Sequence, residues 1–185
     1  MNEWNKKLQI MRRYDLTAHL YDMRYAEEQT AKFKAVLEEL KVDTFGFVLD
    51  AGCGTGLLFD YVAKKSKTLV GIDISRKILD QAKTRAKKFS NIDLVLADVD
   101  NMPLKSNIFN YVFGFTVIQN VPETVKTLME IKRVTKRNAM IVVTGLKKVF
   151  AKEDFAEMLV NAGLSVVALK DEGLQCYVAV CKKRS

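Results

Sequence analysis

The chain has 185 residues, of which 49% are hydrophobic and 28% are charged, and its formal net charge is +8. This composition is typical of a globular protein with one core and excludes collagen, low-complexity disorder and a small disulfide-stapled scaffold. No apolar stretch is long enough to span a bilayer, and the N-terminus lacks the apolar middle of a signal peptide, so we expect a cytoplasmic protein with no membrane partner.

The chain starts with two predicted helices, at residues 5–22 and 26–41, where apolar residues recur at helical spacing. From residue 45 onward, short apolar runs alternate with helical stretches. The runs predicted as strands are 47–49, 68–72, 92–96, 111–115, 139–144, 164–169 and 175–181. The stretches predicted as helices are 57–64, 76–89, 123–135 and 152–162.

Alternating strands and helices indicate βαβ units, a parallel sheet and right-handed crossovers. The last two strands are separated only by residues 170–174, too few for a crossover helix, so the final strand must run antiparallel. The expected fold class is therefore α/β, a three-layer Rossmann-like sandwich around a seven-stranded, mostly parallel sheet with an antiparallel final strand. We expect a single domain over 1–185, with N-terminal helices in 1–44 and the core in 45–185.

A glycine-rich loop follows the first strand and is the strongest local signal for a ligand site. Gly52, Gly54 and Gly56 alternate with other residues, and glycine permits both positive φ and a close approach of a ligand to the backbone. The N-terminus of the helix expected next would offer N–H groups to anionic ligand atoms. The dinucleotide fingerprint has its third glycine one residue later, and Asp50 would repel a pyrophosphate but suit an ammonium group. Both details argue against a nicotinamide oxidoreductase.

Two further acids follow the next two strands. Asp73 is placed to accept hydrogen bonds from ribose hydroxyls, and Asp98 could accept one from an adenine amino group. Because parallel strands end at one edge, Asp50, Asp73 and Asp98 are expected to lie there together. For each acid alone, a helix cap or a turn is an equally good interpretation.

At this point the chain resembles the class I S-adenosylmethionine-dependent methyltransferases, specifically the small type-11 group. The resemblance implies S-adenosylmethionine as cofactor and no metal, and the three cysteines are interpreted as free thiols rather than metal ligands. The cofactor-binding residues that it implies are Asp50, Gly52, Cys53, Gly54, Gly56, Asp73, Ile74, Asp98, Val99 and Phe115.

The catalytic residue stays open. In this group the loop after the fourth strand faces the methyl group, which implies Thr116, Gln119 and Asn120 beside Phe115. The N-terminal helix resembles one that covers the cofactor, and Tyr14 and Tyr21 are expected on one face of it, where they could stack on a substrate or simply pack. His19 in the same helix could be a general base, but a structural role is the better interpretation, since a sulfonium methyl group needs positioning more than a base.

The acceptor is expected to be a small molecule or an RNA component. The loop at residues 116–122 has no Asn-Pro-Pro-Tyr motif, which argues against methylation of planar amide or amino nitrogens. The alternative is a catalytically silent domain that binds the cofactor and supports a partner. Most basic clusters are expected at the edge far from the cofactor. The basic residues expected at the mouth of the site are Arg76, Lys77, Lys147, Lys148 and Lys152.

Residues 92–96 are expected to form an edge strand. Some small methyltransferases of this type pair an edge strand with a small zinc-binding activator protein, and the resemblance permits such a partner here. The alternative is an ordinary edge strand protected by its neighbouring acids, in a chain that is otherwise a monomer.

Overall fold

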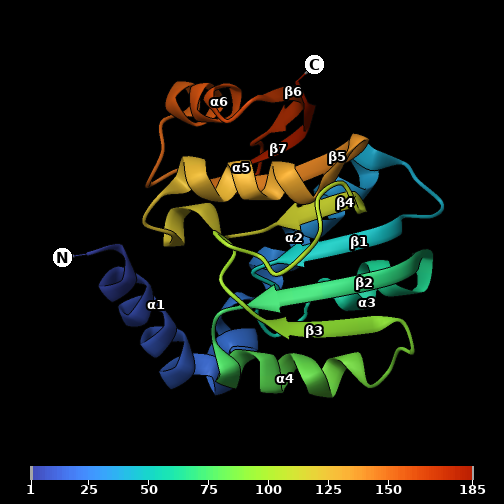
Figure 1. The fold of residues 1–185 in the computed structure, drawn as a ribbon, viewed down its shortest axis with the longest axis vertical. Coiled ribbons are helices and arrows are strands. Elements are labelled where there is room, and N and C mark those ends of the chain that lie inside the picture. Colours follow the sequence, from blue (N-terminus) through green and yellow to red (C-terminus); the bar gives the residue numbers. More distant parts are fainter. Residues whose placement is uncertain (1, 185) are drawn as a thin grey trace.

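The computed structural model describes residues 2–184, apart from the side chains of His19 and Tyr21. Seven strands form one sheet in the order β3-β2-β1-β4-β5-β7-β6 (Figure 1). Their bounds are β1 (Gly46–Ala51), β2 (Ser66–Asp73), β3 (Ile92–Leu96), β4 (Phe109–Gly114), β5 (Thr135–Leu146), β6 (Leu164–Lys170) and β7 (Cys176–Lys183). Only β7 is antiparallel to its neighbours β5 and β6, which confirms the predicted fold class.

The register brings the three predicted acids to one edge of the sheet. Asp50 on β1 pairs with Gly71 on β2, and Asp73 at the end of β2 pairs with Leu96 at the end of β3. Asp98 follows two residues after Leu96, so all three acids lie at the carboxyl ends of neighbouring strands. Within residues 2–184, strand β3 pairs only with β2 and is an edge strand, as predicted.

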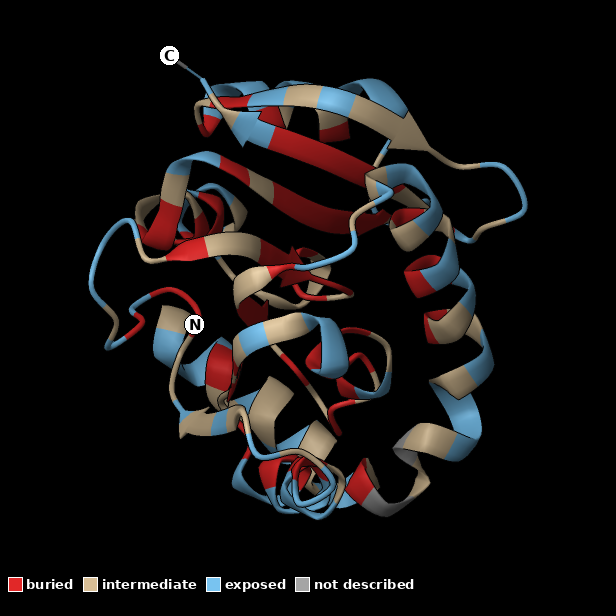
Figure 2. Cartoon of the chain, turned by 90° about the vertical axis from the view of Figure 1, so that its right-hand side faces the viewer, coloured by how far each residue is buried: buried red, intermediate tan, exposed pale blue. Residues whose placement is uncertain are grey.

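Helices cover both faces of the sheet. Their bounds are α1 (Glu3–Thr17), α2 (Tyr21–Leu40), α3 (Phe59–Val62), α4 (Arg76–Ala86), α5 (Thr124–Val134) and α6 (Lys152–Asn161). One apolar core packs α5 and α6 on the sheet through residues such as Leu128 and Phe155, and the other packs α2, α3 and α4 through residues such as Phe33, Phe59 and Leu79. Figure 2 shows the buried residues on the strands and on the sheet-facing sides of the helices. No helix in the described part of the chain is both long and apolar enough to cross a membrane.

The N-terminal helices differ from the prediction. The first ends at Thr17, a 3-10 turn occupies Ala18–Leu20, and α2 begins at Tyr21. Tyr14 and Tyr21 therefore belong to different helices, and the expected shared helix face is wrong. The N-terminal half of this region forms α1, which runs across the carboxyl ends of the strands (Figure 1).

The bounds of one more helix and of one strand also differ from the predicted bounds. The helix expected at 57–64 is one α-helical turn, Phe59–Val62, followed by a 3-10 turn, so no long helix offers its N-terminus to the glycine loop. Strand β5 begins at Thr135 rather than at residue 139, because α5 runs directly into it and buried Thr135 already pairs with Phe109.

Candidate active site

A cleft of about 690 Å³, counted with its open mouth, is lined by residues of α1 and by residues at the carboxyl edge of the sheet. The predicted cofactor residues that line it are Gly52, Gly54, Asp73, Ile74, Asp98, Val99 and Phe115. Tyr14, Thr116 and Asn120 line it as well. A smaller cavity of about 300 Å³ shares Gly52 and Phe115 with the cleft, and Asp50 and Cys53 line its wall.

Among the described residues, two predicted site residues, Gly56 and Gln119, do not line these walls. Gly56 has φ +78°, and a Cβ there would come within 2.4 Å of the Phe59 ring, so this glycine serves the packing of the loop. Gln119 lines neither cavity, and its buried Oε1 has no hydrogen-bond partner in the described part of the chain. The side chains of Tyr21 and His19 lie outside the described residues.

The glycine loop forms the floor of the cleft. Gly52 has φ +72°, and a Cβ there would lie 2.4 Å from Cγ2 of Val117. Both the backbone conformation and the lack of space require glycine at this position. The Val117 side chain can therefore pack directly against the backbone of the glycine loop.

Asp73 ties the glycine loop to the end of β2. Its Oδ2 accepts a hydrogen bond from the Gly54 N–H at 3.0 Å, and its Oδ1 accepts one from the Ser75 N–H at 2.9 Å. Burial raises the pKa of Asp73, and these backbone N–H groups partly oppose that shift. The Ile74 N–H supports the ionised form as well. Three N–H groups leave part of the four lone pairs of the carboxylate free, so Asp73 can still accept a hydrogen bond from a ligand.

Asp50 has the opposite environment. It is 3% exposed, and its carboxyl group has no hydrogen-bond or ion-pair partner among the described residues. Burial is the main cause, and the negative charge of Asp73 the second, that raises the pKa of Asp50 to about 8. A buried carboxyl group without a partner suits a cationic group of a ligand, which would restore its ionised form.

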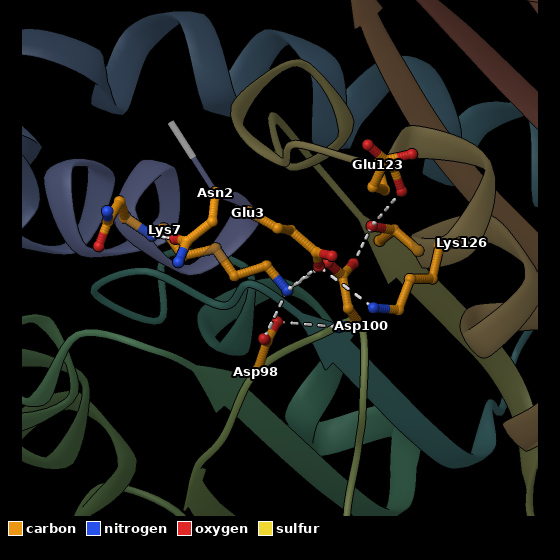
Figure 3. A network of polar contacts seen from close by, with 9 residues as sticks. Asn2, Glu3, Lys7, Asp98, Asp100, Glu123 and Lys126 are labelled. Atoms are coloured by element: carbon orange, nitrogen blue, oxygen red, sulfur yellow. Dashed lines mark hydrogen bonds and ion pairs between the residues drawn. The ribbon is translucent and has the colours of Figure 1, made fainter.

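Asp98 is engaged by a lysine of α1 (Figure 3). The Lys7 Nζ lies 2.7 Å from Asp98 Oδ2, 2.5 Å from Asp100 Oδ2 and 3.0 Å from Glu3 Oε1. Burial alone would lower the pKa of Lys7, but the hydrogen bonds to Asp100, Asp98 and Glu3 outweigh it and raise that pKa above its usual range. This buried ammonium group holds α1 against the loop after β3.

Lys7 is a site residue that was not expected from the sequence, although its position on the helix contained a signal. Lys7, Ile10 and Tyr14 are spaced three and four residues apart, so they share one helix face, and all three line the cleft. Burial raises the pKa of Tyr14, so its phenol is neutral at physiological pH. The basic residues expected at the mouth do not line the cleft: Lys147 donates to the Asp171 carbonyl oxygen and Lys152 to its carboxylate.

Further contacts hold the remainder of α1 in place. Arg13 Nη2 donates to Asn120 Oδ1 at 3.0 Å, and Ser75 Oγ donates to Asp15 Oδ1 at 2.5 Å. The helix is thus fixed both to the loop after β4 and to the start of α4. Asn120, a predicted site residue, therefore has a structural contact on α1 besides its place in the cleft wall.

The comparisons with known proteins agree with this geometry. The family model described as a methyltransferase domain, type 11, matches residues 49–143. The chain belongs to the type-11 methyltransferase family. The resemblance found in its sequence is thereby confirmed.

Curated relatives and solved structures extend the comparison. The demethylmenaquinone methyltransferase of Staphylococcus saprophyticus is 37% identical over 116 residues, which cover 59% of this chain and 48% of the relative. The chain thus spans about half the length of the curated relatives it matches. The crystal structure of a methyltransferase from Aquifex aeolicus superposes with TM-score 0.72 at 22% identity, over 80% of this chain and 88% of the other. A Haloferax volcanii methyltransferase, in complex with the Trm112 methyltransferase activator, gives TM-score 0.81 at 15% identity over 95% and 98%.

Proposed function

We propose that the two connected cavities hold S-adenosylmethionine along the carboxyl edge of the sheet. The unpartnered carboxyl group of Asp50 suits the ammonium group of the methionine part. Asp73, an ionisable acceptor in the cleft wall, suits the ribose hydroxyls, while Ile74 and Val99 offer apolar walls to the adenine beside Asp98. The remaining predicted residues of the glycine loop, Gly52, Cys53, Gly54 and Gly56, would shape the floor, and Phe115 lies in the wall that the two cavities share.

We propose further that the methyl acceptor is a small hydroxylated aromatic molecule. The observation that carries this proposal is the apolar wall that α1 and the loop after β4 give the cleft through Ile10, Tyr14, Val117 and Val121. An aromatic ring fits such a wall, whereas a large RNA would have to pass beneath α1. Relatives of this chain are named demethylmenaquinone methyltransferase. A quinone becomes a hydroxylated aromatic compound when it is reduced to its quinol form, so a quinol belongs to the proposed class of acceptor.

The distribution of charge also favours a small acceptor over an RNA component. Basic side chains lie over the amino ends of the parallel strands, where Lys67 and Lys136 contact the Phe47 ring. Lys183 donates to Asn107 just before β4 begins. These residues are at the edge opposite to the cleft, so they cannot guide a polyanion into it.

Methyl transfer from S-adenosylmethionine to reduced 1,4-naphthoquinone, analysed by mass spectrometry, tests the proposal. We expect a monomethylated naphthoquinone with the wild-type chain and none with Asp73→Ala. Asp93→Ala is the matched control, because Asp93 is exposed on the edge strand β3. Methyl groups found only in a parallel RNA fraction would contradict the proposed acceptor class.

A second candidate function is methyl transfer that depends on an activator protein seated on β3. This edge strand has one free side, and Leu96 at its end is 45% exposed. Strand addition at such an edge would cover both the backbone groups and that side chain. Size-exclusion chromatography with light scattering, combined with the naphthoquinone assay, separates the cases: a monodisperse monomer that is fully active alone excludes the activator.

We also propose that the chain works as one domain, with residues 1–44 as its cover, in the cytoplasm. The contacts of Lys7 and Arg13 with the core support the single unit. Cys53, Cys176 and Cys181 are buried free thiols, which suits a reducing compartment. Limited proteolysis should leave the chain intact between α2 and β1.

A further inference from the structure

Thr116, in the cleft wall after β4, receives two hydrogen bonds from α2 on a single oxygen atom. Lys32 Nζ and Gln29 Nε2 each donate to Thr116 Oγ1 at 3.0 Å. Lys32 is 1% exposed, and its ammonium group lies 2.6 Å from Glu28 Oε1, one turn earlier on the same helix. A buried positive charge therefore stands one hydrogen bond behind the wall of the cleft.

The two donors determine what the Thr116 hydroxyl can still do. A hydroxyl has two lone pairs and one proton, so an oxygen that accepts from Lys32 and Gln29 is left with its proton to donate. The acceptor for that proton within the described chain is Gln29 Oε1, at a long 3.4 Å. Hydrogen bonds in a chain polarise one another, so the ammonium of Lys32 makes the Thr116 O–H a stronger donor.

The backbone of Thr116 is held in an unusual conformation. Its φ is +60°, which is rare for a β-branched residue and disfavoured by its Cβ. The Thr116 N–H donates to Thr144 Oγ1 at 2.8 Å, and Asn120 Nδ2 donates to the Thr116 carbonyl oxygen at 2.7 Å. Strained residues that are fixed in this way gather at functional sites.

Lys32 is more deeply buried than Glu28, the carboxylate with which it forms an ion pair. The Lys32 side chain is 2% exposed, whereas the Glu28 side chain is 33% exposed and thus partly hydrated. Water screens the carboxylate more than the ammonium, so this ion pair contributes a positive potential at Thr116. A residue that only filled the core at this position would not need a charge.

We infer that Lys32 and Thr116 form a relay that stabilises the ionised hydroxyl group of an aromatic acceptor. This inference rests on the proposed function and adds that the acceptor reacts as its phenolate-type anion. The acceptor hydroxyl gives its proton to water. An electron pair of the anion, on oxygen or on a conjugated ring carbon, then forms the bond to the methyl carbon while the carbon–sulfur bond breaks and its electron pair stays on sulfur. Where a ring carbon is methylated, that carbon finally loses its proton to water.

The test measures ionisation of a bound probe, 1-naphthol, by its absorption spectrum in the presence of S-adenosylhomocysteine. We expect the wild-type protein to lower the apparent pKa of the naphthol by about one unit or more. Lys32→Met and Thr116→Val should abolish this shift, whereas Thr116→Ser, which keeps the hydroxyl, should retain it. Lys34→Met is the matched control, because Lys34 is exposed on the same helix.

Three outcomes are decisive. Affinity for S-adenosylhomocysteine within about twofold of wild type in Lys32→Met, together with the lost naphthol shift, supports the relay and shows that the variant is folded. An unchanged naphthol shift, or an unchanged pH profile of kcat/KM on naphthoquinol, in Lys32→Met overturns the relay but leaves the proposed function intact. Absence of both naphthol binding and naphthoquinol methylation in the wild type overturns the proposed function as well.

Discussion

Asp50 and Asp73 are two buried carboxyl groups on neighbouring strands with different surroundings. Asp73 accepts backbone N–H groups from Gly54 and Ser75, which support its ionised form. Asp50 has no partner among the described residues, and burial raises its pKa to about 8. Asp73 has hydrogen-bond donors that support its charge, and Asp50 has none in the described part of the chain. Substitutions at the two sites should therefore affect ligand binding and stability in different ways.

Asp73→Ala should weaken binding of S-adenosylmethionine by about 1–3 kcal/mol, since the ribose hydroxyls would lose a charged acceptor. The fold should survive, because the residue stands at the end of a strand. Isothermal titration calorimetry measures the affinity, with Asp93→Ala as control. Unchanged affinity in the Asp73 variant would remove Asp73 from the cofactor site.

Asp50→Asn should stabilise the ligand-free protein at alkaline pH. The folded-state pKa of about 8 lies above the ordinary 3.8, so the folded chain holds a proton that the unfolded chain has released between these values. Wild-type stability should therefore fall as pH rises from about 4 to 8, and the variant should lack this loss, which is on the order of a few kcal/mol. Urea denaturation at pH 5 and pH 8 measures it.

The same variant should bind S-adenosylmethionine more weakly, because a neutral amide cannot pair with an ammonium group. In the wild type, binding should strengthen as pH rises toward 8 and Asp50 ionises more easily. Equal stability of variant and wild type at both pH values would show that Asp50 is already ionised in the free protein.

At the scale of elements, the sequence predicted strands better than helix ends. The strand that ends at Asp73 is bounded by a turn and a helix cap, since Ser75 accepts from the Ile78 N–H, and such signals are local. The break at Ala18–Leu20 contains no proline or glycine; it is fixed by tertiary contacts such as those of Asp15 with Ser75 and Asp22 with Arg85. Contacts between distant residues cannot be deduced from helical periodicity alone.

Lys7→Met should loosen α1 over the cleft. The variant would leave Asp98 and the fully buried carboxylate of Asp100 without their ammonium partner, which destabilises the closed arrangement. We expect S-adenosylhomocysteine to dissociate about tenfold faster, a change of about 1.4 kcal/mol in the barrier. The single tryptophan, Trp4, lies on α1 and gives a stopped-flow fluorescence signal.

Lys6→Met is the control for this prediction, because Lys6 is the exposed neighbour on the same helix. Circular dichroism verifies that both variants keep their helices. Equal dissociation rates in Lys7→Met and wild type would show that α1 does not limit release of the ligand.

For the whole molecule, the sequence predicted the wall of the site that comes from the sheet and missed the wall that comes from the helices. Asp73, Asp98 and the glycine loop follow strands, and the parallel topology alone places them together. Lys7 and Lys32 reach the site only because α1 and α2 fold back over it. Helical spacing places Lys7 on one face with Ile10 and Tyr14, but it does not show that this face covers the site. The burial of both lysines depends on how the helices pack.

The basic side chains at the amino ends of the strands lie at the edge opposite to the cleft, which determines how activity should depend on salt. The basic groups of the far edge, such as Lys67 and Lys136, lie too far away to attract an acceptor. Lys7 and Lys32, which contact residues of the cleft, are buried and shielded from salt. Activity on naphthoquinol should therefore change by less than about threefold between 50 and 200 mM salt, whereas a protein that makes 6–10 phosphate contacts with nucleic acid loses roughly 10³–10⁵ in affinity over that range. Steady-state kcat/KM at several salt concentrations measures this dependence. A steep fall would indicate a polyanionic acceptor and would contradict the small aromatic one.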